Sequence, residues 1–127
     1  MKILVEVSLG ELVDKISILR LKMERIKDAT KVAAATKEEA VLVASLNSLN
    51  LAGIDAHLGA LQAINGKLWQ IEDDIRVQEK NRKFDDQFIE LARSVYKVND
   101  ERFRAKDAVN QAYGSELEEV KSYEDYS

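Results

Sequence analysis

The feature that most constrains the fold of this chain is a series of aliphatic residues spaced three and four positions apart, in a sequence without proline. One such stripe lies between Leu12 and Ile26, and a longer one lies between Ile54 and Ile75. This spacing is typical of helices that pack against other helices, as in coiled coils. Since proline would interrupt such helices and none of the 127 residues is proline, we predict an all-α fold. The expected architecture is one domain (1–127), an antiparallel bundle of three to four long helices.

A different pattern precedes the first helix. The segment from Lys2 to Val7 is rich in β-branched residues and predicts a short extended strand. A lone strand leaves its backbone groups unpaired, so we expect it to pair with residues 120–123 or with the same segment of a second copy. Ser8 and Glu11 have the spacing of a capping box, and the first helix should therefore begin directly after Ser8.

The remaining helix boundaries are predicted from caps and glycines. Residues 28–35 are expected to form a connector, followed by a second capping box that starts at Thr36. If Gly53 breaks the pattern, the chain is a compact four-helix bundle with a short second helix. Without that break, the second and third helices form one rod of roughly 43 residues that needs a second subunit. A polar turn is expected at 81–85, and Gly114 should end the last helix.

Composition excludes several classes of protein. The chain has no cysteine, so it forms neither disulfides nor thiolate metal sites. Its net charge is −4 with the two signs interspersed, and it has no basic stripe for nucleic acid. No apolar run approaches the ~20 residues of a membrane span, and the apolar start is too short for a secretion signal. We expect a cytoplasmic protein with neither nucleic acid nor membrane as partner.

Several segments carry a resemblance to a known family. They are Gly10–Leu19 (GELVDKISIL), Leu68–Arg76 (LWQIEDDIR), Phe88–Tyr96 (FIELARSVY), Asn99–Asp100 and Lys121–Tyr123 (KSY). In these segments the sequence resembles an uncharacterised family of short all-helical bacterial proteins, a domain of unknown function. The resemblance implies no catalytic residue at any position. Similar modules occur near glycosyltransferase or helical-repeat domains, which suggests an accessory module for glycan-building enzymes as one hypothesis.

The strongest polar cluster predicted from spacing lies on the third helix. Residues four positions apart share a helix face, so Trp69 and Asp73 are neighbours on one face, and Glu72 and Arg76 are neighbours in the same way. One interpretation is a ligand or divalent-cation site, because hard cations take oxygen ligands. The favoured interpretation is a solvated face with one helical ion pair. The candidate ligand cluster, with two residues from the last helix, is Glu72, Asp73, Arg76, Arg93 and Tyr96.

A second acidic pair, Glu11 and Asp14, shares a face of the first helix. If it met Glu72 and Asp73, the four carboxylates would form a metal site like that of all-helical nucleotide pyrophosphatases. The two pairs are expected near opposite ends of a bundle, so no cofactor is predicted. Arg102 occupies an apolar position of the last helix and must find a carboxylate or reach solvent. A buried pair that fixes the helix register is favoured there over an anion site.

Surplus apolar surface without evident chemistry favours a non-catalytic module for protein interaction and oligomerisation, most simply a dimer. The metal-dependent hydrolase and the glycan accessory module are the alternatives. The candidate interface residues are Ile3, Val5, Ile18, Leu21, Trp69 and Tyr123.

Overall fold

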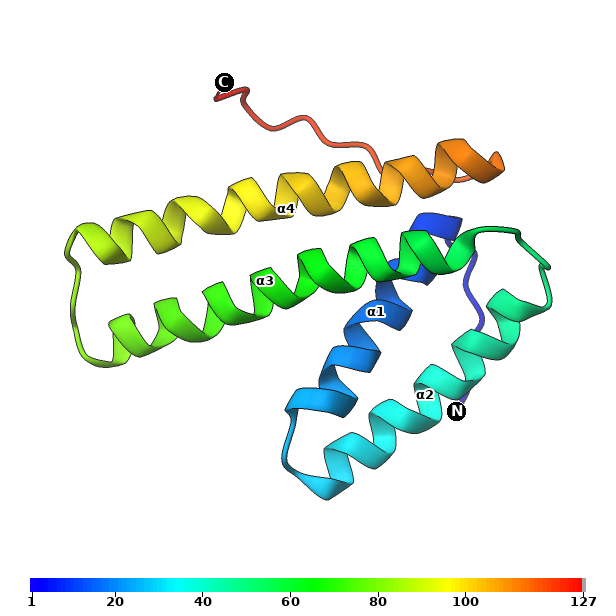
Figure 1. The fold of residues 1–127 in the computed structure, drawn as a ribbon, viewed down its shortest axis with the longest axis horizontal. Coiled ribbons are helices and arrows are strands. Elements are labelled where there is room, and N and C mark those ends of the chain that lie inside the picture. The colour runs from blue at the N-terminus through cyan, green and yellow to red at the C-terminus, as the bar shows by residue number, and fades with distance from the viewer. Residues whose placement is uncertain (127) are drawn as a thin grey trace.

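The chain folds into four helices, and the computed structural model describes residues 1–126. The helices are α1 (Leu9–Arg25), α2 (Ala29–Asn47), α3 (Ile54–Lys80) and α4 (Asp86–Tyr113). Figure 1 shows two antiparallel hairpins, α1–α2 and α3–α4, which diverge like the arms of a V from the end where α1 crosses the other hairpin. The all-α prediction is confirmed. No helix among the described residues combines the length and apolar character needed to cross a bilayer.

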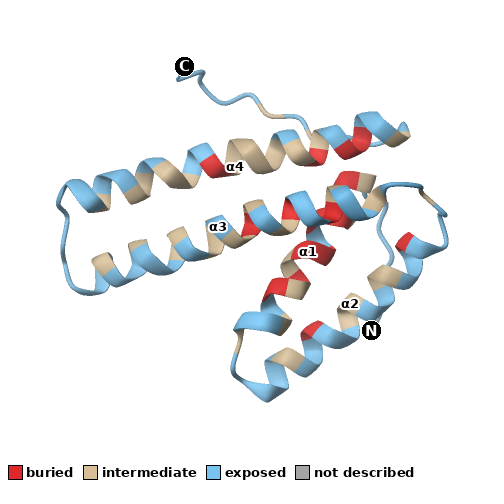
Figure 2. Cartoon of the chain, in the orientation of Figure 1, coloured by how far each residue is buried: buried red, intermediate tan, exposed pale blue. Residues whose placement is uncertain are grey.

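The apolar core lies at the junction of the two hairpins. It consists of Val13, Ile16, Leu46, Leu58, Leu61 and Val109, contributed by all four helices. Figure 2 shows the buried residues gathered near this junction, whereas the free end of the α3–α4 hairpin is exposed or half-buried. Helix α1 packs against each of the other three, while the backbone of α2 approaches only that of α1. The structure therefore depends on α1, which links two otherwise separate hairpins.

The predicted caps of the first and last helices are confirmed. The Ser8 hydroxyl accepts a hydrogen bond from the Glu11 backbone N–H at 3.1 Å, which satisfies a donor that the helix leaves free. At the other end of the chain, Gly114 closes α4 with a φ of 65°. Glycine is favoured in this left-handed conformation because it has no Cβ to clash with the following carbonyl.

The prediction that residues 28–35 form a connector is wrong. Helix α2 begins at Ala29, and the Asp28 carboxylate accepts from the backbone N–H groups of Thr30 and Lys31. The alanines that follow are the best helix formers, so the helix extends back to the first strong cap. Thr36, the expected cap, lies inside α2 and donates to the Val32 carbonyl at 2.7 Å.

The break between the second and third helices is confirmed, and the alternative of one continuous rod is wrong. Helix α2 ends at Asn47, and α3 begins after Gly53, whose φ is 79°. Asn50 in the same loop also has a positive φ, 51°. The Tyr113 hydroxyl donates to the Ala52 carbonyl at 2.6 Å and ties this loop to the end of α4.

The expected N-terminal strand is not formed within residues 1–126. Residues 1–7 have no regular secondary structure and make no hydrogen bond with residues 120–123. The physical reason is that the described chain contains no sheet edge to which such a segment could add. Pairing with a second copy stays a prediction.

Candidate functional site

A buried ion pair joins α1 to α4. The Asp14 side chain is 1% exposed, and Arg102 donates to its two oxygens from Nε at 2.9 Å and from Nη2 at 2.6 Å. This bidentate geometry is the strongest that a guanidinium and a carboxylate form. The hydrogen bonds that Arg102 donates to Asp14 raise the pKa of Arg102, and burial opposes the rise only in part. The prediction that Arg102 needs a carboxylate is confirmed.

Two uncharged side chains complete this network. Asn65 of α3 donates from Nδ2 to Asp14 Oδ1 at 2.9 Å and to Ser17 Oγ at 2.8 Å. The Ser17 hydroxyl donates in turn to the backbone carbonyl of Asp14 at 2.6 Å. Three helices therefore meet at one carboxylate, whose position fixes how α1 crosses the α3–α4 hairpin. We call Asp14, Ser17, Asn65 and Arg102 the buried polar network.

A second polar layer holds the start of α1 against the end of α4. The ammonium of Lys106 lies 3.3 Å from Glu11 and 2.6 Å from Glu119, and its side chain is only 8% exposed. The Gly10 backbone N–H donates to Asn110 Oδ1 at 2.7 Å. Backbone donors in the first turn of a helix need such outside partners. Both carboxylates of the predicted Glu11–Asp14 pair are thus engaged by cations of α4.

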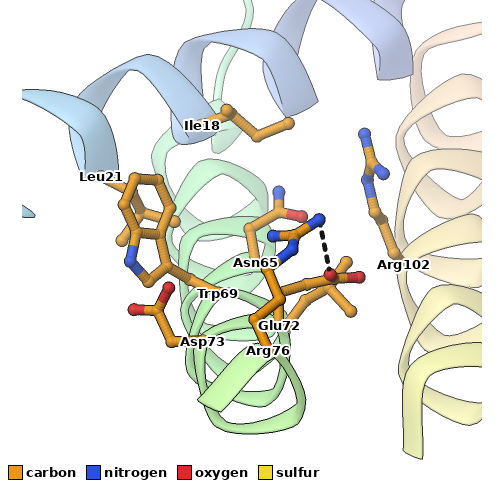
Figure 3. A pocket seen from close by; sticks show the side chains of 9 residues that line it. Ile18, Leu21, Asn65, Trp69, Glu72, Asp73, Arg76 and Arg102 are labelled. Atoms are coloured by element: carbon orange, nitrogen blue, oxygen red, sulfur yellow. Dashed lines mark ion pairs between the residues drawn. The ribbon is translucent and has the colours of Figure 1, made fainter. Parts of the chain in front are cut away.

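A pocket of about 290 Å³ opens beside the buried polar network, between α1, α3 and α4. Figure 3 shows it from close by. Its apolar wall is formed by Ile18, Leu21, Leu68 and Trp69, and its polar groups come from Asn65, Glu72, Asp73, Arg76 and Arg102. Asn65 and Arg102 belong to both the network and the pocket, so the buried carboxylate of Asp14 fixes one side of the pocket.

Part of the predicted ligand cluster lines this pocket. Glu72 and Arg76 form the expected helical ion pair at 3.2 Å, and Asp73 lines the pocket with them. Of the candidate interface residues, Trp69 and Ile18 line it too. Leu21 is 3% exposed, so it belongs to the core and borders the pocket from inside.

The two predicted members from α4 lie elsewhere. Arg93 pairs with Glu90 at 3.1 Å, and its hydrogen bond with Tyr96 is the first cause of its raised pKa. The ring of Tyr96 packs edge-on against Tyr126 of the tail, with centroids 5.1 Å apart. The structure therefore divides the predicted cluster into a group on α3 and a separate group on α4.

The carboxylates predicted for a metal site are not brought together. Within residues 1–126, no group of three or more histidine, cysteine or acidic side chains is placed to hold a metal ion. Asp14 points at Arg102 and Glu11 at Lys106, whereas Glu72 and Asp73 lie along α3. The crossing of α1 turns the first pair toward the cations of α4, so the four carboxylates do not converge on one point.

Sequence reasoning missed Asn65. Its signal was present, because an asparagine between Leu61 and Leu68 interrupts an apolar stripe at helical spacing. A polar residue in such a position is normally hydrogen-bonded when it is buried. Its partners, Asp14 and Ser17, lie 51 and 48 residues away, so they could not be identified from the spacing.

The polar tail runs back along α4. Tyr126 forms a side-chain hydrogen bond with Asp100, which is the first cause of its raised pKa. The candidate interface residue Tyr123 remains 81% exposed. The tail is therefore held by Tyr126, while Tyr123 faces solvent.

The raised pKa of Tyr126 predicts the pH range in which its contact with Asp100 is lost. A group with a raised folded pKa stabilises its contact fully below its ordinary pKa, which is about 10 for tyrosine, and the stabilisation is lost as the pH rises through the raised value. In an alkaline titration followed by tyrosinate absorbance, one tyrosine should ionise after the others. Asp100→Asn should move that late step to lower pH, whereas Asp86→Asn, in the first turn of α4, should not. A late step that persists unchanged in the Asp100→Asn variant would contradict the contact.

Comparison with known protein families gives a match over nearly the whole chain. A protein-family model described as "Family of unknown function (DUF6165)" matches residues 1–126. No curated protein and no solved structure matches the chain. This description assigns no activity to the family, and the role beside glycan-building enzymes stays a prediction.

Proposed function

We propose that this chain, which belongs to the family of unknown function DUF6165, is a non-catalytic interaction module that binds a second copy of itself through residues 1–7. The observation that carries this function is an apolar segment left in water: Ile3, Leu4 and Val5 are 73%, 93% and 73% exposed. Residues 1–7 also form no hydrogen bond with any other described residue. Unpaired backbone next to exposed β-branched side chains is a template for pairing with another strand.

The segment is complementary to itself. In an antiparallel pair centred on Leu4, Lys2 of one copy lies opposite Glu6 of the other, and Ile3 lies opposite Val5. Opposite charges and apolar side chains placed directly across from each other each contribute roughly 0.2–1 kcal/mol to strand pairing. Both contacts occur twice because the pair is symmetric, which favours a second copy over an unrelated strand as the partner.

A second apolar surface supports self-association. A two-stranded ribbon is marginal in water on its own, so the paired segments need further burial. Val77, Phe84 and Ile89, at the free end of the α3–α4 hairpin, are 54%, 56% and 51% exposed. No third helix covers this end of the hairpin within the described chain (Figure 2). Adding a second copy offers the apolar area that a lone hairpin lacks.

The expected result is a dimer that a charge in the segment disrupts. Ile3→Glu combined with Val5→Glu should weaken association at least ~100-fold, because full burial of each such side chain contributes ~1.5–3 kcal/mol. Sedimentation equilibrium at several concentrations measures this change. The helix content seen by circular dichroism should not change, because neither residue contributes to the core. Val120→Glu is the matched control, since Val120 is 82% exposed and lies in the tail.

Charge exchange tests the register. Lys2→Glu and Glu6→Lys should each weaken the dimer, since like charges would then face each other, and the double exchange should restore it. A strict monomer at high concentration in the wild-type protein would remove self-association. If none of the four substitutions changed the affinity of the dimer, the interface would have to lie at the free end of the α3–α4 hairpin and not at residues 1–7.

A further inference from the structure

The buried amide of Asn65 leaves one acceptor directed into the pocket. Its Nδ2 donates to Asp14 and Ser17, and this orientation is fixed by chemistry. A carboxylate only accepts hydrogen bonds, and the Ser17 hydroxyl already donates its proton to the Asp14 carbonyl. The Asn65 carbonyl oxygen is therefore turned away from both, toward the pocket (Figure 3). Asn65 as a whole is 5% exposed, and no residue of 1–126 donates to that oxygen.

The charge in the pocket that is not neutralised by a firm ion pair is negative. Arg102 is already matched by Asp14 through two hydrogen bonds. Glu72 is paired only with Arg76, whose side chain is 74% exposed, and exposed helical pairs are weak enough to exchange partners. Asp73 lines the same pocket and has no ion-pair partner among the described residues. A ligand that complements these groups carries a positive charge.

The apolar wall of the pocket indicates where the positive charge of such a ligand would lie. Asp73 follows Trp69 by one helical turn, so its carboxylate lies on the same face as the indole (Figure 3). The negative face of an indole attracts cations, and the Arg25 guanidinium already lies 6.0 Å from the ring centroid. The rest of the wall is aliphatic, from Ile18, Leu21 and Leu68. An ammonium group beside Trp69 and Asp73 would have its carbon chain on this wall.

The two open groups are too far apart for one ammonium. Asn65 and Asp73 are eight residues apart on α3, about 12 Å along the helix axis. We propose that the pocket binds an elongated aliphatic amine, with its ammonium between Trp69 and Asp73 and a second hydrogen-bond donor at the far end that reaches the Asn65 carbonyl. A free amino alcohol or diamine has this chemistry, and so does a lysine side chain with its own backbone N–H. This binding needs no second copy of the chain.

The only tryptophan of the chain reports on this site, so ligand titrations can be followed by Trp69 fluorescence. Aminohexanol should give a saturable change in the millimolar range. Hexylamine, which lacks the far donor, should bind about fivefold more weakly, and hydroxyhexanoate, with a carboxylate in place of the ammonium, at least tenfold more weakly (about 1 and 1.4 kcal/mol). Equal binding of the carboxylate and the amine, or no saturable change with any of the three, would overturn the assignment.

Matched variants locate the charge contact. Asp73→Asn should weaken aminohexanol binding about fivefold (about 1 kcal/mol). Asp74→Asn is the control, since Asp74 is adjacent, bonds Gln70 and does not line the pocket. Equal losses of affinity in both variants would mean that the amine is attracted by the overall negative charge. That result would also overturn the assignment of the site. Nα-acetyl-lysine methylamide, which keeps the side-chain ammonium, distinguishes the two possible sources of the amine. Tighter binding than that of aminohexanol supports a protein lysine as the natural ligand, and weaker binding supports a free small amine.

Discussion

Replacing Arg102 by alanine is expected to destabilise the fold by about 3–5 kcal/mol, because the Asp14 carboxylate would remain buried without its counter-ion. Asp14 is 1% exposed, so water cannot replace the guanidinium without opening the junction of the hairpins. This loss is a large share of the ~5–15 kcal/mol by which a domain is normally stable. Urea unfolding measures it as a lower midpoint at an unchanged slope.

Two further variants separate this buried pair from charge in general. Arg76→Ala removes an exposed partner of Glu72 and should change stability by less than ~1 kcal/mol. Asp14→Leu combined with Arg102→Met should be less damaging than the sum of the two single changes, because no unpaired charge is left buried. If Arg102→Ala and Arg76→Ala had equal effects, the network would not hold α1 in place.

Gly10→Ala should destabilise the chain by about 3 kcal/mol, the upper end of the usual cost of overpacking. A Cβ at this position would overlap the backbone carbonyl of Lys106 and lie 3.1 Å from Asn110 Oδ1. A backbone carbonyl inside α4 cannot move aside as a flexible side chain can, so the start of α1 would have to shift. Thermal unfolding should show a fall of roughly 4 °C for each kcal/mol in a domain of this size.

Gly59 provides the matched control for this substitution. It also lies within a helix, but nothing stands within 4 Å of the position of its missing Cβ. Gly59→Ala should therefore raise stability by ~0.5–1 kcal/mol, the ordinary gain of alanine over glycine in a helix interior. The two alanine variants are expected to have opposite signs. Two changes of the same sign would show that the close approach of α1 and α4 at Gly10 is not restrictive.

The helices could be predicted from the sequence because their determinants are local. The aliphatic stripes, the Ser8 cap and the glycines at 53 and 114 act within one or two turns of where they lie, and the structure has each of them. The predicted start of α2 was wrong for a local reason too. The helix-forming alanines after the Asp28 cap outweigh the later cap expected at Thr36.

The candidate site depends on contacts that helical spacing does not encode. Arg102 clearly required a carboxylate, but its partner lies 88 residues away. Glu11, Glu72 and Asp73 were equally plausible from charge alone. The choice of Asp14 follows from the angle at which α1 crosses the second hairpin, and that angle results from the packing of the whole core. The same crossing creates the pocket beside Trp69.

The backbone of α2 approaches only that of α1, whereas the outer end of α1 is tied to α3 by Arg25, which donates to the Gly66 carbonyl at 3.3 Å and lies 6.0 Å from the Trp69 ring centroid. No residue of α2 lines the pocket beside Trp69. Val41, which is 59% exposed on α2, is therefore the natural place to attach a fluorophore, since a label carried there would leave that pocket uncovered.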